Sequence, residues 1–234
     1  MLNTMNPPGR MLGGIGTLLG PPQNTHFQMV VKVIKTILPK FAASAMKNGI
    51  ENEDGLNSKL TRFISNAADK ENFFANRESM EDETRGNSPA VDIGIYLKVD
   101  DTGIDPPRIT VFEGKRFSTK LPKKRRREYV IGREEKGKHV PCGGIERFKL
   151  GKHGSRLNHA GMIGYLQDET AEIWHGKINT WIHELCDQSS EPAWSEREQL
   201  TLKKNNERVN EYTSIVKRVD SDLHLTHLWV DLFL

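Results

Sequence analysis

The chain has 234 residues, enough for one large domain or for a domain with an appendage. Its formal net charge of +3, with 28% charged residues, is ordinary for a globular protein, so overall charge identifies no partner. No apolar run approaches the roughly 18 residues that cross a bilayer, and the start of the chain lacks the pattern of a signal peptide. Two cysteines, Cys142 and Cys186, give no disulfide framework. We therefore expect a cytoplasmic protein without a membrane segment.

Residues 1–24 are rich in glycine and proline and are expected to form an irregular arm. The arm also carries apolar side chains: Met11, Leu12, Ile15, Leu18 and Leu19. These side chains suit contact with a hydrophobic groove or with a partner, and simple fraying is the alternative.

Two helices are expected next. Apolar residues recur at helical spacing from Phe27 to Met46, and Pro39 is expected to kink or divide this helix. The second helix is expected over residues 53–68, with a buried stripe formed by Leu56, Leu60, Phe63 and Ile64. Glu53 shares the face of that stripe. A carboxylate at the edge of an apolar stripe needs a reason, such as a cation or the electrostatics of a helix N-terminus.

Three strands are expected to follow, over residues 72–79, 91–97 and 108–115. The turn between the last two is full of breakers, which predicts an antiparallel pair. Asp92 lies at the start of one strand of this pair. Glu113 and Lys115 lie two residues apart at the end of the other, so they point to the same face. Two carboxylates and an ammonium group are therefore expected to meet at one end of the sheet.

Paired carboxylates are ligands that Mg²⁺ accepts, with water and a substrate phosphate in its other positions. Bound Mg²⁺ polarises a phosphate and lowers the pKa of its water. A neighbouring lysine can orient that water and offset charge on the reacting phosphate. The plainer alternative is a surface hairpin with an ion pair between Glu113 and Lys115.

The order Asp…Glu-x-Lys on two strands resembles the PD-(D/E)xK nuclease superfamily, which has the restriction-endonuclease-like fold. Pro89-Ala90-Val91-Asp92 stands where the family has its Pro-Asp element, loosened by two inserted residues, and Glu113-Gly114-Lys115 matches the (D/E)-x-K element. The resemblance covers roughly residues 50–170. It implies an α/β fold with a mixed central β-sheet flanked by helices and an αβββαβ core.

The resemblance also implies the roles of individual residues. Asp92 and Glu113, with the Gly114 carbonyl, would hold one or two Mg²⁺ ions, for which Mn²⁺ can substitute. The first core helix of such nucleases often supplies a further acid, and Glu53 is the candidate for it. Lys115 would position the attacking water.

Six cations fall within the eight positions after Thr119: Lys120, Lys123, Lys124, Arg125, Arg126 and Arg127. Phosphate contacts from Lys and Arg supply most non-specific affinity for nucleic acid. A basic loop beside a carboxylate site would let a polyanion approach, whereas a solvated loop or a nuclear-import-like tract is the alternative. Arg147 and Lys149, on a short helix expected over residues 143–149, are further candidate nucleic-acid contacts.

The rest of the chain is expected to complete the sheet. Further elements are expected at residues 161–166 (strand), 168–186 (helix), 187–198 (linker), and 211–219 with 223–232 (a hairpin that extends the sheet or covers an edge). The expected organisation is an arm (1–24), a nuclease-like core (25–186) and a C-terminal linker and hairpin packed on the core (187–234). The spacing of His139, Cys142, His153 and His159 matches no established zinc pattern.

These features together predict a metal-dependent nuclease. The resemblance favours DNA as substrate and defence against phage or foreign DNA as a setting, and a homodimer if both strands are cut. The alternative is a non-catalytic nucleic-acid-binding or interaction subunit of a larger complex with the same fold. A phosphate loop of the glycine-rich type followed by Lys-Ser or Lys-Thr is absent from the sequence.

Overall fold

The computed structural model describes residues 23–100, 103–188 and 192–233. The helices are α1 (Gln23–Lys47), α2 (Glu53–Ala67), α3 (Gly144–Lys149) and α4 (Ala171–Cys186), with single 3-10 turns η1 (Ala68–Lys70), η2 (Lys123–Arg125) and η3 (Glu196–Glu198). The strands are β1 (Phe73–Met80), β2 (Ala90–Leu97), β3 (Arg108–Phe117), β4 (Arg133–Glu135), β5 (Lys138–Val140), β6 (His159–Leu166), β7 (Thr201–Asn205), β8 (Val209–Lys217) and β9 (Asp222–Asp231). The arm expected over residues 1–24 lies almost entirely outside the described residues.

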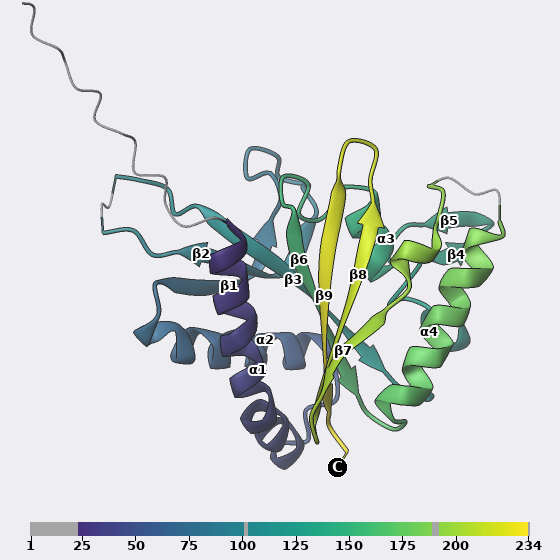
Figure 1. Cartoon of the computed structure of the whole chain (residues 1–234), viewed down its shortest axis with the longest axis horizontal. Coiled ribbons are helices and arrows are strands. Elements are labelled where there is room, and N and C mark those ends of the chain that lie inside the picture. Colours follow the sequence, from purple (N-terminus) through teal and green to yellow (C-terminus); the bar gives the residue numbers. More distant parts are fainter. Residues whose placement is uncertain (1–22, 101–102, 189–191, 234) are drawn as a thin grey trace, which may run out of the picture.

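The centre of the molecule is a mixed sheet of seven strands in the order β1-β2-β3-β6-β9-β8-β7, and β4 and β5 form a separate hairpin. Helices cover both faces, with α1 and α2 on one side and α4 on the other (Figure 1). Each face carries its own cluster of buried side chains, because the helices bury one apolar stripe each against the sheet. The expected α/β class, with a mixed central sheet flanked by helices, is confirmed.

The first helix is longer than expected and is not divided. Pro39 lies inside α1, where it has no N–H to donate to the helix. Its ring is exposed, while Leu38, Phe41 and Ala42 beside it are fully buried against the sheet. Burial on both sides of the proline keeps the helix continuous.

The three strands expected after α2 are present, and the last two form the expected antiparallel pair. β1 pairs with β2 and β2 with β3, both antiparallel, and β3 then pairs in parallel with β6 after a crossover that contains α3. α2 begins with Asn52 as its cap, whose side chain accepts a hydrogen bond of 2.7 Å from the Gly55 N–H. This cap positions the first turn of α2, and with it Glu53, over the sheet.

The hairpin of β8 and β9 extends the sheet, but it is not an addition packed on a finished core. β9 lies in the middle of the sheet and pairs in parallel with β6 from His159 opposite His224 to Leu166 opposite Asp231. β7, which the sequence analysis did not predict, forms the edge next to β8, and all its side chains are exposed. A fully exposed edge strand carries no apolar alternation that would reveal it.

A buried polar network ties the loop before α3 to β8 and β9. The Tyr129 hydroxyl lies 2.7 Å from His227 Nδ1 and accepts a hydrogen bond of 2.9 Å from Trp229 Nε1. Ser214 Oγ lies 2.9 Å from the other ring nitrogen of His227. Every polar atom of the His227 ring therefore has a partner, which a buried imidazole requires.

We predict that His227 stays neutral at pH 5 and makes the fold acid-sensitive. Burial lowers the pKa of His227 to about 3, whereas the unfolded chain keeps an ordinary value of 6.5. The unfolded state therefore binds the extra proton as pH falls below 6.5, and stability falls by up to about 1.4 kcal/mol per pH unit. Side-chain ¹⁵N NMR checks this, with exposed His183, whose pKa is raised by its hydrogen bond to Glu196, as the charged control. A midpoint for His227 near 6.5 in the folded protein would contradict it.

Candidate active site

The candidate site lies where the ladder between β2 and β3 ends. The two strands pair as far as Ile93 and Phe112. The next residue on each strand is a carboxylate, Asp92 on β2 and Glu113 on β3. The Gly114 N–H turns to the side chain of Asp92 and donates a hydrogen bond of 2.8 Å to its Oδ2. The end of the ladder thus gathers the acidic residues that the sequence predicted.

Lys115 is the centre of this group. Its side chain is 9% exposed, and its Nζ lies 2.9 Å from Glu113 Oε1 and 3.0 Å from Glu53 Oε1. The ammonium also donates a hydrogen bond of 3.2 Å to the Gly114 carbonyl. Burial alone would lower the pKa of Lys115, but the neighbouring carboxylates of Glu113, Glu53 and Asp92 raise it above its ordinary value. The lysine is therefore a permanent cation among carboxylates.

Glu53 reaches the site from the first turn of α2. One carboxylate oxygen accepts from Lys115 Nζ, and the other accepts a hydrogen bond of 3.3 Å from the Arg116 N–H. The sequence left two explanations open for Glu53, a nearby cation or the electrostatics of a helix N-terminus. The nearby cation is present. Its place in the first helical turn also gives it the favourable interaction with the helix N-terminus.

Glu113 is almost fully buried, 1% exposed, and has two neighbours besides Lys115 that the sequence analysis did not predict. Arg147 Nη1 lies 3.1 Å from Glu113 Oε1, and His153 Nδ1 lies 3.2 Å from Oε2. Burial alone would raise the pKa of Glu113, but Lys115, His153 and Arg147 hold it below its ordinary value. Glu113 is therefore an anion at neutral pH. The contact to His153 is not aligned as a hydrogen bond, so Oε2 is buried without one.

At Asp92, burial outweighs the neighbouring positive charges in setting the pKa. Burial and the charge of Glu113 raise its pKa to about 7, against the weaker effects of Lys115 and of the hydrogen bond from Gly114. Two carboxylates of one site thus differ in protonation at neutral pH, with Glu113 charged and Asp92 half protonated. Such separation is common at functional sites, although structural ion pairs also produce it.

Gly114 must be a glycine for α2 to pack here. A Cβ at this position would lie 2.0 Å from Asn57 Oδ1. The Asn57 side chain is buried and is held by a hydrogen bond of 2.7 Å from the Tyr165 hydroxyl, so it cannot move aside at low cost. The close approach of α2 to β3 brings Glu53 within reach of Lys115.

Carboxylate oxygens are ligands that a hard divalent cation accepts. Among the described residues, no cluster of three or more His, Cys, Asp or Glu is arranged to hold a metal ion, and this includes the histidines and Cys142 considered for zinc. Mg²⁺, however, usually takes one or two carboxylates and fills its other positions with water and phosphate oxygens. The buried Glu113 Oε2 without a hydrogen bond, and the Asp92 carboxyl with its raised pKa, are the oxygens that a cation would satisfy.

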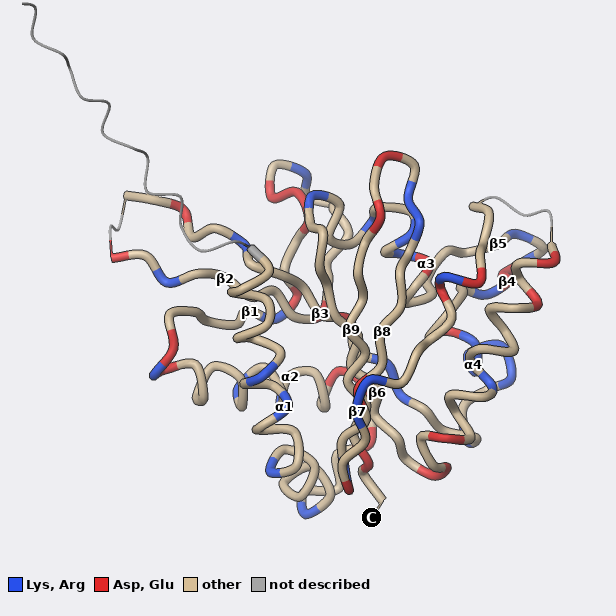
Figure 2. Tube along the Cα trace, viewed as in Figure 1, with Lys and Arg blue, Asp and Glu red and all other residues tan. Residues whose placement is uncertain are grey.

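The expected nucleic-acid contacts are only partly available. Lys123 and Lys124 are exposed at η2, and Arg147 is 31% exposed beside Glu113. Three arginines of the run hold the loop together: Arg125 pairs with Glu128, Arg126 donates to two carbonyls, and Arg127 pairs with Glu184. Figure 2 shows Lys and Arg interleaved with Asp and Glu along the trace, so charge alone marks no binding face.

Lys149 is not a surface contact. Its side chain is buried, lies 2.5 Å from Glu198 Oε1 and donates a hydrogen bond of 3.1 Å to the Lys217 carbonyl. This contradicts the expectation that Lys149 binds nucleic acid. The sequence gives no sign of this contact, because Lys149 is an isolated lysine on a short helix and its buried partner, Glu198, follows 49 residues later.

No family model, curated protein or solved structure matches this chain. None of the helices in the described part of the chain has the length and apolar character needed to span a bilayer. Two carboxylates, a buried lysine and backbone oxygen at the end of a ladder can hold a cation and position a water or a phosphate.

We predict that Asp92→Asn stabilises the metal-free protein at pH 8 but not at pH 4. Because the folded pKa of about 7 lies above the unfolded value of 3.8, the folded state holds more protons between these values, and wild-type stability falls as pH rises. Asparagine cannot ionise, so the variant gains about 4 kcal/mol at pH 8. Urea unfolding in EDTA measures the difference, with exposed Asp54→Asn as control. A gain that is the same at both pH values would contradict the assignment.

We also predict strong coupling between Lys115 and Glu113. Lys115→Met leaves a buried carboxylate with one fewer cation and should cost about 3 kcal/mol of unfolding free energy. Adding Glu113→Gln removes the uncompensated charge and should recover part of that loss. Urea unfolding of the two single variants and the double variant at pH 7 completes the cycle. Additive losses would show that the two side chains do not stabilise one another.

Proposed function

We propose that this protein is a metal-dependent nuclease that hydrolyses phosphodiester bonds, with DNA as the preferred substrate. The observation that carries the proposal is the convergence of Asp92, Glu113 and Lys115 at the end of the β2–β3 ladder. The element order α2-β1-β2-β3-α3-β6, with β3 parallel to β6, supports a restriction-endonuclease-like core. The resemblance of the sequence to PD-(D/E)xK nucleases predicts the same residues.

The proposed roles follow from the contacts. Asp92, Glu113 and the Gly114 carbonyl would hold Mg²⁺ or Mn²⁺, which supplies polarisation of the phosphate and a bound water of lowered pKa. Lys115 carries a fixed positive charge, so it can offset negative charge on the reacting phosphate. Its three donor hydrogens face Glu113, Glu53 and the Gly114 carbonyl, so it would orient the attacking water by giving up one of these contacts. Glu53 keeps the ammonium in place, and Arg147 and His153 keep Glu113 ionised.

Substrate binding would use the cations that remain exposed. Lys123 and Lys124 on η2, with the half-exposed Arg147, can contact backbone phosphates. A double-strand break would need a second active site, so we propose a homodimer for that product. Defence against phage or foreign DNA is the setting that the resemblance favours.

A second function competes with this one. Lys115 and Arg147 already neutralise Glu113 without a metal ion, so the charge cluster can stabilise the fold by itself. A non-catalytic nucleic-acid-binding subunit, or an interaction subunit of a larger complex, would keep this cluster for structural reasons. Stability measurements cannot separate the two functions, but cleavage assays can.

The test is cleavage of supercoiled plasmid and of single-stranded DNA with Mg²⁺ or Mn²⁺. Asp92→Asn, Glu113→Gln and Lys115→Met should each lower the rate at least about 100-fold, because each removes a group that acts on the reacting phosphate. The control is Asp54→Asn. It also removes one carboxylate charge, but from an exposed side chain that follows Glu53 in the sequence, and it should cut at the wild-type rate.

The outcomes separate the two functions. Circular dichroism of each variant shows whether loss of cutting reflects loss of folding. Cutting that survives all three substitutions would place the activity elsewhere. A folded wild-type protein that binds DNA and cuts with neither metal would favour the non-catalytic subunit.

A further inference from the structure

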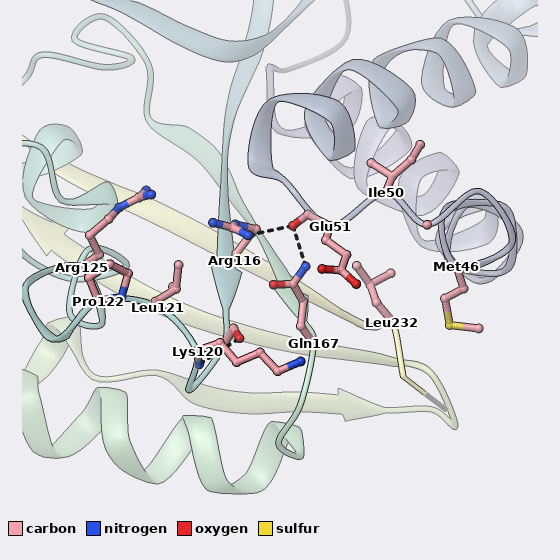
Figure 3. Close-up of a pocket in the computed structure, with 12 residues that line it drawn as sticks. Met46, Ile50, Glu51, Arg116, Lys120, Leu121, Pro122, Arg125, Gln167 and Leu232 are labelled. Atoms are coloured by element: carbon pink, nitrogen blue, oxygen red, sulfur yellow. Dashed lines mark hydrogen bonds between the residues drawn. The ribbon is translucent and has the colours of Figure 1, made fainter.

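A pocket of about 370 Å³ opens beside the candidate active site (Figure 3). It lies between the turn that joins α1 to α2, the end of β3 and the basic loop that follows. Arg116 belongs to its lining and directly follows Lys115 on β3. The Arg116 N–H also donates to Glu53 Oε2, so the pocket and the site share one backbone segment. We call it the Arg116 pocket.

The Arg116 pocket has an excess of positive charge. Its charged lining residues are Arg116, Lys120 and Arg125, opposed by the single carboxylate of Glu51. Figure 3 shows the Arg116 and Arg125 side chains directed toward one another across the pocket. Two guanidinium groups that face each other repel, and an anion placed between them removes that repulsion.

The arginines keep donors for such an anion. Arg116 uses Nη1 for a hydrogen bond of 2.9 Å to the Glu51 carbonyl, and its Nε is buried without a partner. Arg125 uses Nε for Glu128. A guanidinium group has five N–H donors, so each arginine can still donate to a phosphate. Lys120 is exposed at the mouth and adds a mobile charge.

The opposite side of the pocket is apolar. Met46, Ile50 and Leu232 lie on this side, whereas the fourth apolar lining residue, Leu121, lies beside Arg125 (Figure 3). A wall of cations facing an apolar surface suits a nucleotide, whose phosphate meets the cations while its sugar and base cover the apolar side chains. An inorganic anion would leave that apolar surface uncovered.

We propose that the Arg116 pocket holds a nucleotide of the nucleic-acid strand next to the phosphodiester that enters the candidate active site. The proposal deepens the nuclease function and rests on it for the identity of the strand. The pocket places a phosphate among Arg116, Lys120 and Arg125, one residue along β3 from Lys115. Side chains of consecutive β-strand residues point to opposite faces, so the nucleic-acid strand would pass from the pocket to Lys115 around Glu53, which accepts from both the Lys115 ammonium and the Arg116 N–H.

Glu51 gives the proposal a test that loss of folding cannot imitate. Its backbone carbonyl accepts from Arg116 and from Gln167 Nε2, but its side chain is exposed and adds the only negative charge to the pocket lining. Glu51→Gln keeps the backbone contacts and removes that charge. The variant should bind a phosphodiester strand about twofold to threefold more tightly than wild type.

Binding is measured by fluorescence anisotropy of a short single-stranded DNA in EDTA, where cleavage does not interfere. Arg116→Gln, Lys120→Gln and Arg125→Gln should each weaken binding about threefold to tenfold, and each should reduce the slope of log affinity against log salt by about 0.7. Lys120→Gln removes only an exposed side chain, so it cannot act through the fold. The matched control is Lys70→Gln, an exposed lysine in η1 beyond the far end of α2.

Unchanged binding in the Lys120 and Arg125 variants, with no gain in Glu51→Gln, overturns the Arg116 pocket whether or not the protein cuts DNA. Deoxyadenosine monophosphate that binds more tightly than the strand overturns it too, because the pocket then takes a free nucleotide. The expected losses in a wild-type protein that never cuts support the pocket and contradict the nuclease function. The two proposals can therefore fail separately.

Discussion

The burial of the Lys115 ammonium is the constraint on which this end of the molecule depends. An ammonium taken out of water costs several kcal/mol unless carboxylates and hydrogen-bond acceptors surround it. Glu113 and Asp92 come from adjacent strands, and Glu53 comes from the first turn of α2. The cap at Asn52 and the glycine at position 114 bring that turn close enough. Replacing Glu113 or Glu53 by a neutral residue takes from Lys115 one of the carboxylates that offset the cost of its burial.

The same charges set the protonation of the site. Glu113 is held ionised by Lys115, by Arg147 and by its contact with His153, whereas Asp92 shares the burial without the last two contacts and has a raised pKa. A half-protonated carboxyl beside an ionised one is the arrangement expected of a site that exchanges a proton for a cation. A purely structural ion pair needs only Lys115 and Glu113. Burial and the charge of Glu113 are enough to raise the pKa of Asp92, and a bound cation would lower it again.

Local sequence patterns were enough to predict the elements that carry the site. The apolar stripe of α2 and the alternation in β2 and β3 are short-range signals. They were enough to predict that Asp92, Glu113 and Lys115 lie close together. The contacts of Arg147 and His153 with Glu113 could not be predicted in this way, because they join residues more than 30 positions apart through a loop without periodicity. The burial of Lys149 and the central place of β9 have the same cause. Both depend on long-range packing, which no local pattern encodes.

Glu53 links the candidate active site to the Arg116 pocket. One of its oxygens accepts from the Lys115 ammonium and the other from the Arg116 backbone. The start of α2 therefore fixes both the lysine that would act on a phosphate and the strand segment that carries the first cation of the pocket. A shift of α2 would move both together, since neither contact can be kept without the other. These two contacts account for a carboxylate at the edge of an apolar helix stripe better than helix-terminus electrostatics alone.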